Sequence, residues 1–311
     1  MQEREKGQQL LDLDENGKTL SQPKKEEKPA QEDLTYILIV FLLVVIICLA
    51  IKIFIFPNEM KKNIFANQYL NKNDVNQAAG DFILKYVKKN KKAKIGLGSG
   101  SSTKGLYEYI ISKYKKRNVS FKNVQFYSLD GFCGVPKTDK NSYYYNLKTN
   151  FLSKIDAEEK NIHLINEDVT PSNEENCQKE AEKYNQELKN AKLDIQILGF
   201  GDNGHFGFNQ PETEFTSETR AVKMDEATRK DKSKLFGTLD KTPEYAISQG
   251  ISNVLAAKEV VVIALGKNKA NALKSLLVSE PSIHSPISAL KTHLGKVIVY
   301  YDKDAASELK K

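Results

Sequence analysis

The sequence is poor in cysteine. Its three cysteines, Cys48, Cys133 and Cys177, have no paired spacing, and no histidine or further cysteine stands at the intervals of a zinc site. This pattern predicts neither a disulfide framework nor a metal site, and it fits a reducing compartment best. Cys133 is expected to be a small packing residue.

The sequence also lacks arginine-rich runs. Its formal net charge of +7 comes from lysines scattered along the chain, without interleaved aromatic residues. A nucleic-acid-binding surface gathers basic residues on one face or helix, so no nucleic-acid partner is expected. With 40% hydrophobic residues in 311, the chain is able to build a substantial core.

A third absence is local, because residues 34–51 carry no charged side chain. The apolar run continues past Lys52 to Phe56, and Pro57 then ends it. A run of this length crosses a bilayer as a helix, so we expect one transmembrane helix over 34–56 and a membrane partner for it. The alternatives are a buried core helix, which rarely lacks a polar face for so long, and a cleaved signal peptide, for which the run is too long.

The segments on either side of this span differ in composition. Residues 1–33 are rich in Lys, Glu and Gln and too polar to bury a core, so we expect a disordered tail. Lysines lie on both sides of the span, and the positive-inside rule therefore gives no orientation. A globular domain is expected over 62–311.

Within 62–311, apolar runs alternate with amphipathic helices. This alternation predicts an α/β fold, with a mostly parallel sheet and helices on both faces. The expected strands are 93–98, 124–130, 161–165, 193–200, 260–265 and 296–301. In such sheets the ligand lies beyond the carboxyl ends of the strands.

Polar or glycine-rich segments follow three of these strand ends. The first, "GLGSGSST" at 96–103, stands between a strand and a helix, where backbone N–H groups, the helix dipole and hydroxyls cradle a phosphate. It has neither the Gly-Lys-Ser/Thr of a P-loop nor the GxGxxG of a dinucleotide fold, and a plain tight turn is the alternative. The second, "SLDGFCGVP", holds Asp130, which is either a base acting on a bound sugar or a capping residue.

The third segment, "LGFGDNGHFGFNQP" at 198–211, surrounds His205 with glycines. Glycines permit unusual dihedral angles and close approach of a ligand, which leaves the imidazole as the titratable group at this strand end. The other three histidines lie in ordinary strand or helix patterns. A purely structural role for His205 is the alternative.

Together these segments resemble the glucosamine/galactosamine-6-phosphate isomerase family. "GFGDNGHFGFNQP" is similar to the G-x-G-x-[DN]-G-H-I-[AG]-F-N-E-P motif of its glucosamine-6-phosphate deaminases, "LGSGSSTKGLY" to the family's phosphate loop, and "FYSLDGFCGVP" to its F-N-L-D-E-Y-V-G-L segment. The late segments "TPEYAISQGISNVLAAKEVVVIALGKNKANAL" and "SPISALKTHLGKVIVYYD" match in order and spacing. The resemblance covers about 62–311.

The resemblance implies conversion of glucosamine 6-phosphate and water into fructose 6-phosphate and ammonia, without a cofactor. It assigns ring opening to His205 and proton transfer between C2 and C1 to Asp130, with Asn203 and Gln210 beside the histidine. Phosphate binding falls to the residues matched with the family's cradle and cations: Ser99, Gly100, Ser101, Ser102, Lys234 and Lys269. Because sugar phosphates are charged and made in the cytosol, we expect a membrane-anchored protein whose catalytic domain faces the cytoplasm.

Four positions depart from the family pattern. Gln210 replaces a glutamate, and a neutral amide orients an imidazole without supporting its positive charge. Lys234 stands where the family usually has arginine, so a bidentate phosphate grip becomes a point charge. Gly131 replaces a glutamate beside the base. Arg220 falls near an allosteric arginine of regulated members, but Val222 occupies the neighbouring basic position, so allostery is not inferred.

Two other functions compete with the deaminase. A sugar-phosphate-binding sensor or scaffold without turnover would keep the phosphate-binding residues while lacking carboxylate support for His205. Isomerase or lactonase activity on another sugar phosphate is the third possibility, because related folds share parts of the motifs. The sequence does not distinguish glucosamine from galactosamine, nor does it give the oligomeric state.

Overall fold

The computed structural model describes residues 37–45 and 63–309 of the chain, which divides into two units, Met1–Pro57 and Asn58–Lys311. In the first unit, residues 37–45 are helical and their nine apolar side chains are all exposed. Within the described residues, no helix is long and apolar enough to span a membrane. The predicted tail at 1–33, and most of the predicted span at 34–56, lie outside the described residues.

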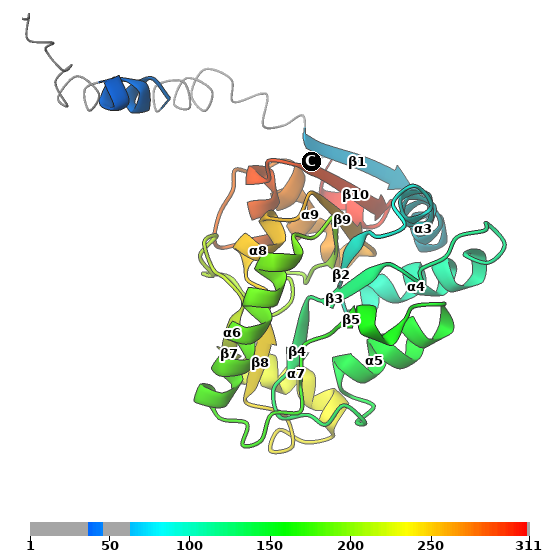
Figure 1. The fold of residues 1–311 in the computed structure, drawn as a ribbon, viewed down its shortest axis with the longest axis vertical. Helices are drawn as coiled ribbons and strands as arrows, with labels where there is room; N and C mark the ends of the chain where they lie inside the picture. The colour runs from blue at the N-terminus through cyan, green and yellow to red at the C-terminus, as the bar shows by residue number, and fades with distance from the viewer. Residues whose placement is uncertain (1–36, 46–62, 310–311) are drawn as a thin grey trace, which may run out of the picture. The chain divides into compact units, whose positions relative to one another are not determined.

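The second unit is built on a seven-stranded sheet in the order β1-β10-β9-β6-β2-β3-β5, in which every neighbouring pair is parallel (Figure 1). These strands are β1 (Ile64–Tyr69), β2 (Lys94–Leu97), β3 (Gln125–Ser128), β5 (Ile162–His163), β6 (Ile195–Gly199), β9 (Glu259–Ala264) and β10 (Lys296–Asp302). The predicted α/β fold with a mostly parallel sheet is confirmed.

Helices cover both faces of this sheet. The helices are α3 (Lys72–Lys89), α4 (Ser101–Lys113), α5 (Tyr143–Asn150), α6 (Glu174–Ala191), α7 (Glu226–Phe236), α8 (Ile251–Leu255) and α9 (Ala270–Leu277), with short 3-10 turns η2 (Leu152–Lys154), η3 (Glu159–Asn161), η4 (Lys267–Lys269), η5 (Pro286–Thr292) and η6 (Ala305–Glu308). Strand β9 shows how the faces are assigned. Val260 and Val262 join a core with α6 and α9, whereas Val261 and Ile263 join a core with α3 and α4. Because side chains alternate along a strand, an all-apolar strand is buried on both faces.

A second, three-stranded sheet was not predicted. It is antiparallel, in the order β4-β8-β7, and consists of β4 (Asp130–Phe132), β7 (Arg220–Lys223) and β8 (Tyr245–Ser248). The expected strand over 124–130 is therefore wrong at its end, because β3 stops at Ser128 and Asp130 opens β4. The apolar pattern continues through Leu129, which is buried. The hydropathy of the sequence therefore does not show where the chain leaves the first sheet and enters the second.

The prediction that no disulfide is present is wrong. Cys133 and Cys177 are bonded, with their Cα atoms 6.0 Å apart, and both are buried. They are separated by 44 residues in sequence, and the fold brings the start of α6 against the segment that follows β4. Cys133 is therefore a cross-link rather than a packing residue, and the cysteine pattern no longer argues for a reducing compartment.

Candidate active site

The predicted phosphate loop lies between β2 and α4, as its sequence indicates. Gly100 caps α4 in an extended conformation, so Ser101 and Ser102 occupy the first helical turn. Thr103 Oγ1 donates to the Gly98 and Gly100 carbonyls at 2.9 and 3.0 Å, which holds the loop carbonyls on the protein side. The amides of a helix's first turn have no partner within the helix, and they are available to an anion.

Asp130 lies beside this loop. Ser99 Oγ donates to Asp130 Oδ1 at 2.6 Å, and the Asp130 side chain is buried. Burial raises the pKa of Asp130 to about 6, although the hydrogen bond from Ser99 and the charge of Lys232 act in the opposite direction. The raised pKa makes this carboxylate a stronger base than an exposed aspartate, and a pKa of about 6 still leaves it mostly ionised at pH 7.

His205 lies in a turn that glycine makes possible. Gly204 and Gly207 have φ values of +83° and +55°, in the region that L side chains rarely adopt. A Cβ at position 201 would lie 2.1 Å from His205 Cε1, so the imidazole packs directly on the Gly201 backbone. The glycines around His205 therefore place its ring.

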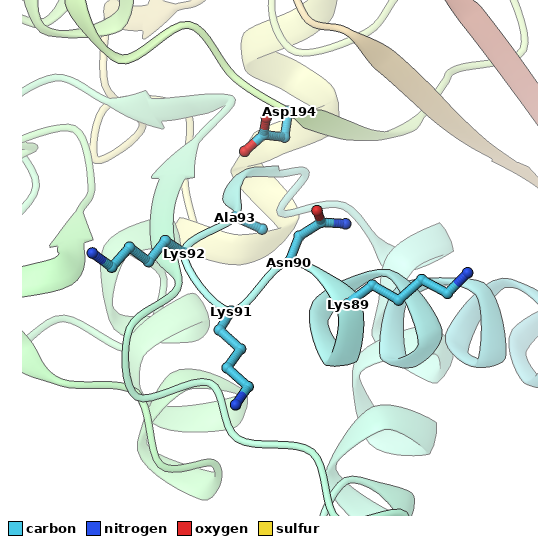
Figure 2. A pocket seen from close by; sticks show the side chains of 6 residues that line it. All are labelled: Lys89, Asn90, Lys91, Lys92, Ala93 and Asp194. Carbon is cyan, nitrogen blue, oxygen red and sulfur yellow. The ribbon is translucent and has the colours of Figure 1, made fainter.

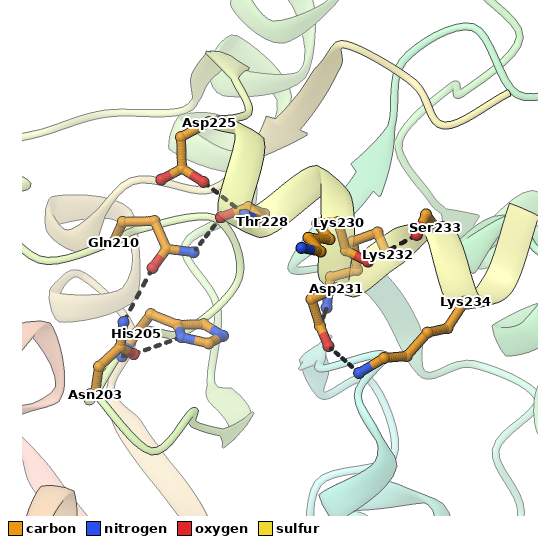
Figure 3. Close-up of polar contacts among 10 residues, drawn as sticks. All are labelled: Asn203, His205, Gln210, Asp225, Thr228, Lys230, Asp231, Lys232, Ser233 and Lys234. Carbon is orange, nitrogen blue, oxygen red and sulfur yellow. Dashed lines mark hydrogen bonds and ion pairs between the residues drawn. The ribbon is translucent and has the colours of Figure 1, made fainter. Parts of the chain in front are cut away.

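A chain of amides orients the imidazole (Figure 3). Asn203 Oδ1 lies 2.6 Å from His205 Nδ1, and Asn203 Nδ2 donates to Gln210 Oε1 at 3.3 Å. Gln210 Nε2 in turn donates to Thr228 Oγ1 on α7 at 3.5 Å. Gln210 is thus linked to His205 through Asn203, and it makes no direct contact with the ring among the hydrogen bonds of the described residues.

Three strand ends meet here. Ser99 from the β2 end bonds Asp130 from β4, and a Cβ on Gly207, in the turn after β6, would lie 3.7 Å from Asp130 Cβ. Gly199, the last residue of β6, would meet Ser102 Cβ at 2.8 Å if it carried a Cβ. The predicted phosphate cradle, carboxylate and histidine turn therefore form one site at the carboxyl edge of the sheet.

Two lysines face this site. Burial and then the charges of Lys232 and Lys269 hold the pKa of His205 below its ordinary value, and burial, with Lys232 also contributing, lowers the pKa of Lys269. Lys232 comes from α7 and Lys269 from η4. Lys232 pairs with Asp231 at 3.4 Å, and the charge of Asp202 favours the charged form of Lys269. Two partly buried cations at one site suit the binding of a dianion such as a phosphate.

The structure does not bring Lys234 to this position. The Lys234 side chain is 79% exposed, whereas that of Lys232 is 25% exposed. Both ammonium groups pair with Asp231, Lys234 at 3.1 Å and Lys232 at 3.4 Å (Figure 3). The two lysines therefore differ in burial, and the Lys232 side chain is the one that packs into the fold. The sequence did not indicate Lys232 as a candidate phosphate-binding residue, because the spacing of the family motif matches position 234.

Arg220 supports the histidine turn from β7. Its Nη1 donates to Asn209 Oδ1 at 3.0 Å, and Asn209, fully buried, donates to the Phe206 and Gln249 carbonyls. Arg220 therefore supports, through Asn209, the turn that carries His205.

A separate depression lies at the opposite edge of the sheet (Figure 2). It is lined by Lys89, Asn90, Lys91, Lys92, Ala93 and Asp194. The β2 and β6 strands begin at Lys94 and Ile195, so this is the amino edge. The three lysines and Asn90 are exposed, and Asp194 is paired with Lys258 at 2.6 Å. It holds none of the predicted site residues.

Comparison with known proteins identifies the family. The model of the glucosamine-6-phosphate isomerases/6-phosphogluconolactonase family matches residues 71–299. The chain belongs to this family. Glucosamine-6-phosphate deaminases of Oceanobacillus iheyensis and Shouchella clausii are 35% and 36% identical to it, over 77% and 76% of this chain and 94% of each relative.

Solved structures agree with this family. A monomeric glucosamine-6-phosphate deaminase superposes with a TM-score of 0.73 at 31% identity, covering 78% of this chain and 99% of its own. The 6-phosphogluconolactonase of Trypanosoma brucei superposes with a TM-score of 0.64 at 18% identity, which shows the shared fold alone.

The contact between Asn203 and His205 predicts that a carboxylate at position 203 would stabilise the protonated form of His205. Asn203→Asp would place a carboxylate on Nδ1, and we expect it to raise the pKa of His205 by about 1 to 3. Gln210→Glu would raise it less, because position 210 acts through Asn203. NMR titration of the His205 imidazole in the two variants measures both effects. Equal changes in the two variants would contradict the relay.

Proposed function

We propose that this chain converts glucosamine 6-phosphate and water into fructose 6-phosphate and ammonia. The observation that carries the proposal is the buried carboxylate of Asp130, bonded to Ser99 of the phosphate loop at 2.6 Å, in a member of this family. A base that is buried next to a phosphate cradle suits proton abstraction from a carbon near the phosphorylated end of a sugar.

The proposed roles follow the chemistry of the groups. Neutral His205 takes the proton of the anomeric hydroxyl and returns it to the ring oxygen, which opens the ring. Asp130 then removes the proton from C2 and delivers it to C1, while a proton of the C2 amine passes to the aldehyde oxygen, so that C1 becomes an alcohol and C2 an imine. Water adds to the imine carbon and ammonia leaves. The lowered pKa of His205 keeps the imidazole unprotonated at neutral pH, ready to accept the first proton.

For the phosphate, we propose Ser99, Gly100, Ser101 and Ser102 as the cradle and Lys269 with Lys232 as the cations. Lys234 has at most a minor role in this proposal, because its side chain is 79% exposed, whereas that of Lys232 is 25% exposed.

Ammonia release tests the activity. Purified full chain in detergent is expected to release ammonia and form fructose 6-phosphate in equal amounts. Binding of glucosamine 6-phosphate without ammonia release would instead favour a sugar-phosphate-binding sensor. The observation that favours this second function is that neither Asn203 nor Gln210 supplies a carboxylate to His205. Hydrolysis of 6-phosphogluconolactone would favour the lactonase.

We further propose that residues 34–56 anchor the protein in a membrane, preceded by a polar tail over 1–33 and followed by the catalytic domain over 62–311. Residues 37–45 support the anchor, because each of these nine side chains is apolar and at least 40% exposed. Such an apolar surface is stable in lipid and unfavourable in water. We place the domain on the cytoplasmic side, where its charged substrate is made.

The full chain is expected to sediment with membranes and to need detergent for release. Leu42→Asp combined with Leu43→Lys would place two charges in the middle of the span and shift the protein to the supernatant, since each charge costs about 2.5–3.5 kcal/mol in a helix at the bilayer centre. Membrane association that survives this double change would contradict the anchor. Protease added to intact cells is expected to spare the domain.

A further inference from the structure

Glu167 is a buried carboxylic acid that the proposed mechanism does not use. It lies between β5 and α6 with 1% of its surface exposed. Its Oε1 accepts from the Tyr144 amide at 2.7 Å and its Oε2 from the Tyr143 amide at 3.2 Å, at the first turn of α5. No lysine or arginine pairs with it among the described residues.

The same residue holds the segment that follows the base. The Glu167 carbonyl accepts from the amides of Gly134 and Val135 at 2.8 and 3.0 Å. These amides follow β4, the strand that Asp130 opens. Glu167 therefore connects the strand of Asp130 to α5 through both its main chain and its side chain.

Gly131, the residue next to Asp130, leaves room for this carboxyl group. A Cβ at position 131 would lie 2.9 Å from both Cγ and Oε1 of Glu167, closer than real Cβ atoms approach. The resemblance puts a glutamate at position 131, and here the carboxyl group beside the base comes from another segment. Glycine at 131 and glutamate at 167 are thus two parts of one arrangement.

We propose that Glu167 is the positioning residue for Asp130, filling the space that Gly131 vacates and tying β4 to α5. The proposal rests on the proposed function, in which Asp130 is the base. Glu167 itself touches no reacting atom in this role.

The protonation of Glu167 suits this role. Burial raises its pKa to about 8, against the hydrogen bonds from Tyr144, Ser142 and Tyr143, and the charge of Asp130 raises it further. Asp130 of β4 and the Tyr143 phenol of α5 are the titratable groups that face it, while Lys232 and Asp231 of α7 act on these two in turn. At pH 7 a neutral Glu167 adds no second negative charge beside the base. Above pH 8 it ionises and repels the Asp130 carboxylate.

The first test uses Glu167→Gln, whose amide does not titrate. We expect kcat at pH 7 to stay within about threefold of that of the parent. The decrease of kcat/KM near pH 8 should disappear in the variant, because such a decrease reports the ionisation of a single group.

Stability gives a readout independent of activity. Between about pH 4.5 and pH 8, Glu167 keeps its proton in the folded protein, whereas the unfolded chain has released it. The free energy of unfolding of the parent therefore decreases as pH rises through this range, and that of Glu167→Gln should decrease less. Exposed Asp168→Asn is the matched control.

The second test exchanges the two residues. Glu167→Gly alone should lower kcat about tenfold or more with little change in KM, because a shifted base loses alignment with C2. Gly131→Glu alone should be worse, because its Cβ has no room. The double variant Gly131→Glu/Glu167→Gly should exceed Glu167→Gly in kcat by about fivefold or more, since the two sites are coupled.

The outcomes separate the two proposals. A parent protein that releases no ammonia overturns the proposed function, and the role of Glu167 with it. If the parent protein is active, the role of Glu167 alone is overturned when Glu167→Gln keeps two properties of the parent. These are the fall in kcat/KM near pH 8 and the full dependence of stability on pH. Should the exchanged variants not fold, the Glu167→Gln comparison decides by itself.

Discussion

Asp130→Asn is expected to lower kcat by about 10² to 10⁴, the usual contribution of a general base. Asparagine has the same shape and still accepts the hydrogen bond from Ser99 Oγ, but it cannot take the C2 proton. The phosphate cradle is unchanged, so KM should stay within a few-fold. Steady-state ammonia release gives both constants, and turnover close to that of the parent protein would show that Asp130 is not the base.

The same substitution should make the protein more stable. The folded pKa of Asp130, about 6, lies above its ordinary value of 3.8, so the folded chain keeps a proton that the unfolded chain releases between these pH values. Stability from this residue is therefore lost as pH rises from about 4 to 6, by up to about 3 kcal/mol at neutral pH. Asp130→Asn removes this loss, and thermal unfolding at pH 7 measures the gain. A variant less stable than its parent would indicate misfolding rather than loss of a base.

The pH profile of the parent enzyme should carry the same pKa. Because the base must be ionised, kcat/KM is expected to fall below about pH 6. Ser99→Ala removes a hydrogen bond that favours the carboxylate, and the acid limb should then move to higher pH.

Lys232→Ala is expected to raise KM for glucosamine 6-phosphate by about 10- to 100-fold, because a charge-assisted hydrogen bond contributes about 1.5–3 kcal/mol. The effect on kcat should be smaller, since the phosphate is bound equally in the ground and transition states. Lys269→Ala should behave in the same way. Loss of Lys232 should also raise the pKa of Asp130, because its charge favours the carboxylate.

Lys234→Ala is the matched control, from the same helix and with the same loss of charge. Its side chain is exposed and paired with Asp231, and exposed pairs contribute at most about 1 kcal/mol. We expect KM within about twofold of the parent, because an exposed charge of this kind is screened by solvent. A large rise in KM for Lys234→Ala with none for Lys232→Ala would reverse the assignment.

Local pattern accounts for what the sequence alone predicted correctly. Continuous apolar runs such as 260–265 mark strands buried on both faces, and glycine and serine after a strand mark the loop that leads into α4. The turn around His205 was evident because its glycines permit backbone angles that other residues avoid. Each of these signals is carried by neighbouring residues, so each is visible before the chain folds.

Long-range packing decided the rest. The bond between Cys133 and Cys177, the transfer of Asp130 to a second sheet, and the meeting of Glu167 with Gly131 all join segments that are distant in sequence. The burial of Lys232 rather than Lys234 depends on how α7 packs, which a lysine-rich segment leaves open. Composition and periodicity determine which residues enter a core, whereas the contacts among polar side chains depend on where the packed elements come to lie.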